Sequence, residues 1–242
     1  MFFLFPGLPM LPYLLIHVAA ALLPAFLLLR YVYRHDAVEK EPPRLLVRLL
    51  GMGVLSAVCA GLIERIGIAR LDAAVSSGST IYTVLLAFFV VAVAEEGTKL
   101  LLLKRSTWND PNFNYRFDGI VYSVFVSLGF AALENLKYVF SYGLSVALPR
   151  ALLAVPGHMS FAVFMGIYYG RARLCENCGD HAAATRNLWI GYLTAVFLHG
   201  FYDTCAMIGT TGSTLVFLAF VVLMFTRAYR AIRYESATDS EI

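Results

Sequence analysis

Charged side chains are scarce in this chain of 242 residues, of which aspartate, glutamate, lysine and arginine make up 14%. Soluble domains carry about 25% charged residues. Hydrophobic residues make up 60% of the chain, and they gather in runs of about 20 residues, the length of a helix that crosses a bilayer. Short alternating segments typical of membrane β-barrels are missing. The composition excludes an ordinary soluble domain and predicts an all-α, polytopic transmembrane helix bundle.

Cysteine is rare, and lysine and arginine are missing from the first apolar run and the segment before it, up to residue 29. The four cysteines, Cys59, Cys175, Cys178 and Cys205, do not make a disulfide scaffold in a chain of this length. Cys175 and Cys178 lie near His181 but lack a second pair of ligands, so we do not expect a zinc site there. No basic residue precedes the first apolar run, which favours a retained span over a cleaved signal. The net charge of +3 is small, and we expect no nucleic-acid partner.

Familiar hydrolase and nucleotide-binding motifs are also missing. The chain has no phosphate-binding glycine loop, no Gly-x-Ser-x-Gly and no His-Glu-x-x-His. Neither a serine hydrolase nor a zincin therefore has motif support. No internal repeat is visible, and we expect a single transmembrane domain over residues 1–242.

Seven apolar runs follow one another along the chain, at about residues 8–33, 45–63, 81–103, 119–142, 151–170, 188–207 and 213–229. The polar segments between them predict loops, among them residues 35–44, 70–80, 104–116 and 171–187. Arginine and lysine are concentrated in alternate connecting segments. By the positive-inside rule, the N-terminus is outside and the C-terminus cytoplasmic. We expect a multi-pass protein of the plasma or inner membrane, surrounded by lipid.

The third run contains two adjacent glutamates and a lysine, Glu95, Glu96 and Lys99. A charged side chain at the bilayer centre costs roughly 2.5–3.5 kcal/mol on insertion scales, so these residues should face protein or water and mark a functional site. Glu95 and Lys99 are four residues apart and share a helix face, which lets them pair. Glu96 is therefore expected to be less engaged by Lys99. The alternative is a structural ion pair that fixes helix packing.

Three further runs carry ionisable side chains at a similar depth. They are, in chain order, Glu134 and Asn135 one turn after Phe130, then His158, then His199 and Asp203. An aspartate four residues after a histidine can orient its imidazole ring. Each group alone is compatible with hydrogen-bonded helix packing. Their coincidence predicts that four helices converge on one polar cavity.

The order of these motifs resembles that of the PrsW-type intramembrane proteases, as Glu95-Glu96-x-x-Lys99, Phe130-x-x-x-Glu134-Asn135, His158 and His199-x-x-x-Asp203. That family is similar to the CAAX prenyl protease and bacteriocin-processing group, which has histidine in place of Glu134 and asparagine in place of Asp203. The resemblance covers about residues 81–207, the expected site-bearing part. It implies an intramembrane endopeptidase that cuts a single-span, membrane-anchored substrate resembling an anti-sigma factor, on its extracytoplasmic side.

Peptide hydrolysis requires an activated water and a stabilised oxyanion. We expect Glu95 or Glu96 to act as the base. His199, held by Asp203, would donate to the oxyanion or to the leaving amine. The expected catalytic residues are Glu95, Glu96, Glu134, His158, His199 and Asp203, with Asn135 and Lys99 as substrate-positioning residues.

Other mechanisms and functions fit the same residues. We expect no cofactor; in a metal-dependent alternative, zinc would be held by Glu96, Glu134, His158 and His199 with an open position for water. A chain of buried ionisable groups also serves as a proton relay in ion-coupled transporters, although the paired broken helices of such transporters are missing. A membrane scaffold, in which the glutamates would be replaceable, is the third alternative.

Overall fold

The computed structural model describes residues 10–242, which are helical apart from short connections and one isolated β-bridge. The predicted all-α class is confirmed. The predicted start of the first run, residues 8 and 9, lies outside the described residues. The longest helices are α1 (Met10–His35), α2 (Pro43–Ala74), α5 (Asp118–Tyr142), α7 (Val155–Asn177), α8 (His181–Ile208) and α9 (Thr211–Ala237).

Two further stretches complete the bundle. Between α2 and α5, α3 (Thr80–Leu85), the π-helix η1 (Leu86–Ala92) and α4 (Val93–Thr107) follow without a break. Between α5 and α7, the 3-10 turn η2 (Leu144–Val146), α6 (Ala147–Pro149) and the π-helix η3 (Arg150–Ala154) lead directly into α7. The described residues thus form seven helical rods, one for each apolar run.

Several rods extend beyond the apolar runs that predicted them. α2 continues to Ala74, about three turns past the predicted end near residue 63. α7 reaches Asn177 and α8 begins at His181. The loops predicted at residues 70–80 and 171–187 were therefore too long. Hydropathy marks where an apolar surface ends, whereas arginine and glutamate continue a helix into the aqueous phase because they are good helix formers.

Five of the described helices are long and apolar enough to cross a membrane, namely Met10–His35, Pro43–Ala74, Asp118–Tyr142, Leu144–Asn177 and Thr211–Ala237. The other two long rods are residues 80–107 and α8. These two carry the Glu95–Glu96–Lys99 and His199–Asp203 groups.

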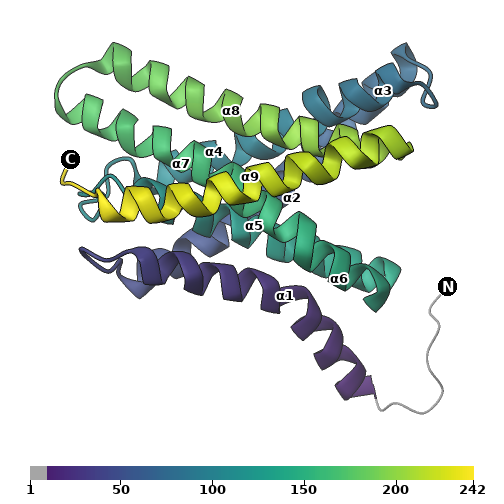
Figure 1. Cartoon of the computed structure of the whole chain (residues 1–242), viewed down its shortest axis with the longest axis horizontal. Coiled ribbons are helices and arrows are strands. Elements are labelled where there is room, and N and C mark those ends of the chain that lie inside the picture. Colours follow the sequence, from purple (N-terminus) through teal and green to yellow (C-terminus); the bar gives the residue numbers. More distant parts are fainter. Residues whose placement is uncertain (1–9) are drawn as a thin grey trace.

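Helix α5 lies at the centre of the bundle (Figure 1). All its residues from Asp118 to Ala131 are buried. Glycines let α2 approach it closely: a Cβ atom on Gly129 would lie 2.4 Å from the Leu50 carbonyl oxygen, and one on Gly53 would lie 2.0 Å from the Val126 carbonyl oxygen. Small residues of this kind allow membrane helices to pack backbone to backbone.

We expect Gly129→Ala to destabilise the folded protein by about 1–3 kcal/mol, because the added methyl group meets backbone that must move. Gly51→Ala is the matched control, since a Cβ atom on Gly51 meets nothing within 4 Å. Thermal unfolding in detergent measures both. A Tm of the Gly129 variant equal to that of the Gly51 variant would contradict the close approach of α2 and α5.

Two buried carboxyl groups lie where α1 joins α2, at the end of the bundle that holds the C-terminus (Figure 1). Asp36 is 1% exposed and Glu41 is 4% exposed. Burial raises the pKa of Asp36 from 3.8 to about 6, and the Lys40 ammonium opposes this only in part. Burial also raises the pKa of Glu41. Both groups therefore bind a proton more tightly in the folded protein than in the unfolded chain.

Stability should consequently fall as the pH rises. Between the unfolded pKa of 3.8 and the folded pKa of about 6 at Asp36, the folded protein binds more protons than the unfolded chain. We expect a higher Tm at about pH 4.5 than at about pH 7.5, and a smaller difference in Asp36→Asn. The exposed Asp72, changed to asparagine, is the control. An unchanged pH dependence in Asp36→Asn would refute this assignment.

Candidate active site

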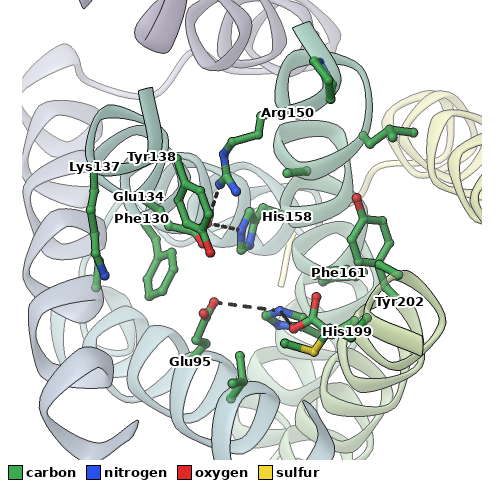
Figure 2. A pocket seen from close by; sticks show the side chains of 18 of the residues that line it. Glu95, Phe130, Glu134, Lys137, Tyr138, Arg150, His158, Phe161, His199 and Tyr202 are labelled. Atoms are coloured by element: carbon green, nitrogen blue, oxygen red, sulfur yellow. Dashed lines mark hydrogen bonds and ion pairs between the residues drawn. The ribbon is translucent and has the colours of Figure 1, made fainter. Parts of the chain in front are cut away.

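A cavity of about 640 Å³ lies in the half of the bundle away from the C-terminus. Its walls come from the C-terminal parts of α2, α5 and α8, from η1 and the start of α4, from α6 and η3, and from the starts of α7 and α9. Figure 2 shows Glu95, Glu134, His158 and His199 around this space. The side chains that were predicted to converge thus come from α4, α5, α7 and α8 and surround one cavity.

Lys99 is the centre of the buried polar network. Its Nζ lies 3.2 Å from Glu95 Oε2, 2.8 Å from Glu96 Oε1 and 3.2 Å from His158 Nδ1. The ammonium also lies 4.0 Å from the centre of the Phe130 ring. Lys99, both glutamates and His158 are each at most 6% exposed. Because a lysine ammonium has three N–H donors, it can donate one hydrogen bond to each of these three acceptors.

The two adjacent glutamates have different surroundings. Glu96 is 0% exposed, and its Oε1 lies 2.8 Å from His199 Nδ1 as well as next to Lys99. Glu95 contacts Lys99 through Oε2 and lines the cavity. The expectation that Glu96 would be the freer of the two was wrong. Lys99 reaches back to the residues three and four positions earlier at once, and it lies closer to Glu96.

His199 is held on both sides by carboxylates. Its Nδ1 faces Glu96, while its Nε2 lies 3.4 Å from Asp203 Oδ2 and 4.0 Å from Glu95 Oε2. The ring stacks on Phe161 with a centroid distance of 4.8 Å. The predicted contact between His199 and Asp203 is therefore present. The contact with Glu96, across more than a hundred residues of sequence, was not predicted by any local spacing.

A second arm of the network runs from His158 to α5 and η3. Because Lys99 donates to Nδ1, we assign the hydrogen of neutral His158 to Nε2, which donates to Glu134 Oε2 at 2.9 Å. Arg150 donates to the same carboxylate oxygen at 2.9 Å. Both nitrogens of His158 are thus engaged by neighbouring side chains.

Arg150 is a site residue that the sequence did not reveal. Its Nε donates to Asn135 Oδ1 at 2.7 Å, and its guanidinium lies 3.9 Å from the centre of the Tyr138 ring. Asn135 is 0% exposed and donates to the Ala21 carbonyl oxygen of α1. Asn135 therefore holds Arg150 and α1 in place, and it does not line the cavity. The one signal for Arg150 was an arginine at the edge of the apolar run that contains His158.

Both helices that carry Glu95 and His158 are preceded by π-helical turns. η1 ends three residues before Glu95, and η3 ends four residues before His158. π-helical turns shift the register of a helix and are frequent at functional sites. η3 also places Arg150 beside Glu134 and Tyr138. No local pattern in the sequence indicated either turn.

Comparison with known proteins gives the same assignment as the motifs. The sequence model of the family described as PrsW family intramembrane metalloprotease matches residues 41–228. The chain belongs to the PrsW family. It is 35% identical to Protease PrsW of Geobacillus kaustophilus over 186 residues, which are 77% of each chain. No solved structure matches the chain.

Two other PrsW relatives show the same extent of similarity. Protease PrsW of Oceanobacillus iheyensis is 31% identical over 223 residues, which cover 91% of this chain and 97% of that protein. Protease PrsW of Bacillus subtilis is 32% identical over 186 residues, which cover 77% of this chain and 80% of that protein. Family membership and the apolar helices make this chain a multi-pass membrane protein of an intramembrane protease family.

The description of the PrsW family implies a metal ion. Within residues 10–242, Glu95, Glu96 and His158 form the one group of three acidic, histidine or cysteine side chains whose donor atoms lie within 4.8 Å of one another. All three accept hydrogen bonds from Lys99, and His158 is also bound to Glu134. The ammonium engages one oxygen of each carboxylate and Nδ1 of His158, leaving Glu96 Oε2 without a partner in the described part of the chain, and its positive charge repels a second cation. In this arrangement the residues do not fit a metal ion.

Of the four residues expected to hold zinc in the metal-dependent alternative, only Glu96 and His158 belong to this group. All six predicted catalytic residues do lie in one connected network. Their individual catalytic roles stay predictions.

Proposed function

We propose that this protein is a glutamic-type endopeptidase in which Glu95 activates a water molecule inside the cavity. The main support for this proposal is the difference between the adjacent glutamates. Glu95 borders the cavity, whereas Glu96 is enclosed by Lys99 and His199. The contacts of Glu95 with Lys99 and His199 both involve its Oε2. None of residues 10–242 is hydrogen-bonded to the other oxygen of Glu95, Oε1, which is therefore available to a water molecule.

The reaction follows from this arrangement. Glu95 accepts a proton from water while the water oxygen bonds to the carbonyl carbon of the scissile peptide. The carbonyl oxygen becomes an oxyanion, which a positioned donor stabilises. The C–N bond then breaks, and the proton held by Glu95 passes to the leaving amine. The products are a new carboxylic acid, whose proton passes to the new amine to give a carboxylate and an ammonium group, and Glu95 is regenerated as a carboxylate.

His199 is the best-placed donor to the oxyanion. Carboxylates face both of its nitrogens, Glu96 at Nδ1 and Asp203 at Nε2, so both nitrogens can carry hydrogen. His199 and Glu95 line the same cavity and approach to 4.0 Å. A carbonyl bound between them would meet the base and the donor together. His158 and Glu134 hold the opposite wall through Lys99 and Arg150.

The arrangement of the bundle supports an extracytoplasmic reaction. Basic residues such as Arg34, Lys104, Arg173 and Arg233 lie near the helix ends on the side of the C-terminus. We place this side in the cytoplasm by the positive-inside rule, with seven spans and the N-terminus outside. The cavity then lies in the outer half of a plasma or inner membrane. This position suits a single-span substrate, such as a membrane-anchored anti-sigma factor, cut on its outer side.

The test is cleavage in proteoliposomes that hold the purified protein and a panel of single-span membrane proteins, including a membrane-anchored anti-sigma factor. We expect cleavage of at least one substrate near the outer end of its span, and no cleavage with Glu95→Gln. A transporter predicts proton-coupled uptake into the same vesicles with no proteolysis. A scaffold predicts no proteolysis and no uptake. Absence of proteolysis, with or without proton-coupled uptake, would overturn the proposal.

Arg150 should act as a positioning residue for this reaction. Arg150→Met removes one of the two donors to Glu134, so the hold on His158 and Lys99 loosens. We expect kcat to fall about 10-fold to 100-fold, as small misplacements at active sites do, with partial recovery in Arg150→Lys. Lys137→Met is the control, because Lys137 is an exposed cation that lines the same cavity. Equal rates for Arg150→Met and Lys137→Met would argue against this role.

A further inference from the structure

We infer that the Lys99 ammonium is a built-in cation that stands where a metal ion would bind, so that this chain keeps its glutamate–histidine centre metal-free. The inference deepens the proposed function, on which its meaning for catalysis rests. Glu95, Glu96 and His158 have the ligand types and the spacing of a three-residue metal site. They differ from a metal site because the Lys99 ammonium lies between them.

The contacts of Lys99 match those of a cation held by three ligands. Its Nζ accepts no hydrogen bond and has three donors, and three acceptors lie 2.8–3.2 Å from it. These are hydrogen-bond distances, whereas zinc would draw oxygen and nitrogen ligands to about 2.0–2.2 Å. The Phe130 ring faces the ammonium at 4.0 Å, a favourable contact for a cation. The surroundings are thus built for one positive charge of this size.

The position of Lys99 on the helix also keeps its ammonium at the centre of these three residues. It lies on the same helix as both glutamates, three and four residues later, and it is 2% exposed. A metal ion entering beside it would place a second cation next to the ammonium within a buried site, where like charges repel strongly. Binding a metal ion would therefore require the loss or displacement of the lysine charge.

We therefore expect that a variant without the Lys99 ammonium binds a metal ion at this centre. In Lys99→Met the apolar side chain retains much of the volume, and two carboxylates and one imidazole nitrogen are left without their shared donor. A divalent ion satisfies such a set, with water in the open position. Lys99→Arg keeps the positive charge and should continue to exclude metal.

The test is cobalt binding by purified full-length protein in detergent, measured after removal of metal with a chelator. Cys175 and Cys178 are first changed to serine, because Cys178 is exposed, Cys175 is half-buried, and both are close in sequence to His181 and could bind cobalt themselves. Elemental analysis counts the bound ions, and the visible absorption of Co²⁺ reports nitrogen and oxygen ligands. No substrate is needed, so the result does not depend on whether the protein is a protease.

We expect about one Co²⁺ per chain in Lys99→Met, and a Tm that rises when cobalt is added, since binding to the folded state stabilises it. Wild type and Lys99→Arg should bind no ion at this centre. The double variant Lys99→Met/Glu95→Gln should lose the gained ion. Retained binding in the double variant would place the ion elsewhere and overturn the inference.

The wild-type sample decides the matter even if Lys99→Met fails to fold. Uptake of one Co²⁺ by wild type that disappears in His158→Gln would overturn the inference, and no such uptake supports it. A folded Lys99→Met that binds no cobalt would overturn it as well. Failure of the proposed protease function appears separately, as an absence of cleavage in the proteoliposome assay with the metal-binding pattern unchanged.

Discussion

Replacing Glu95 by glutamine lowers the rate of cleavage by about 10²–10⁴-fold, the contribution of a general base, while the fold remains intact. Glutamine keeps the shape of the side chain, and its amide oxygen can still accept a hydrogen bond from Lys99. What it loses is the ability to take a proton from water. Because Glu95 borders the cavity and glutamine retains this hydrogen bond, we expect a folded protein with only a small drop in Tm, together with an almost complete loss of kcat.

The neighbouring glutamate supplies the contrast. Glu96→Gln weakens two buried contacts at once, those with Lys99 and with His199. Removing one partner of a buried charged network is strongly destabilising, so this variant should show a lowered Tm as well as reduced activity. Glu64→Gln is the matched control, since Glu64 lines the same cavity from α2. Full activity of Glu95→Gln, or equal loss in Glu64→Gln, would show that Glu95 is not the base.

His199→Gln should produce the second-largest loss, about 10²–10³-fold in kcat, the effect of removing one donor to an oxyanion. KM should change much less, because the contact strengthens as charge develops on the carbonyl oxygen. Asp203→Asn should cause a smaller loss, since it perturbs only the orientation of the His199 ring. Steady-state kinetics with a single-span substrate separates kcat from KM.

The control for His199 lies on the same helix. His181 is exposed at the opposite end of α8, so His181→Gln makes the same chemical change outside the site and should leave kcat unchanged. If His199→Gln raises KM and leaves kcat intact, His199 binds substrate and does not stabilise the transition state. That result would refute the role assigned to it.

Much of the architecture was predictable from the sequence because the bilayer imposes a length on each apolar helix. Within residues 10–242, each of the seven runs corresponds to one helical rod, although several rods are longer than their runs. Similar depth in the membrane also predicted that four ionisable side chains converge, since such groups within a bilayer face one another or a water-filled cavity. They are Glu95, Glu134, His158 and His199. Spacing also predicted the contact between His199 and Asp203.

The assignments within the site could not be predicted in the same way. Spacing alone favoured Lys99 pairing with Glu95, but the flexible lysine reaches both glutamates and also His158. The contact between Glu96 and His199 depends on how α4 and α8 pack, which no local pattern encodes. Arg150 was missed because its role depends on the π-helix η3, which aligns it with Glu134.

The most direct test of the central claim is mass spectrometry of the products formed from a single-span substrate in proteoliposomes prepared in ¹⁸O-labelled water. The account predicts one new C-terminus near the outer end of the substrate span, labelled with ¹⁸O by wild type and by Glu64→Gln, and absent with Glu95→Gln. Labelled product formed by Glu95→Gln at the wild-type rate would contradict it.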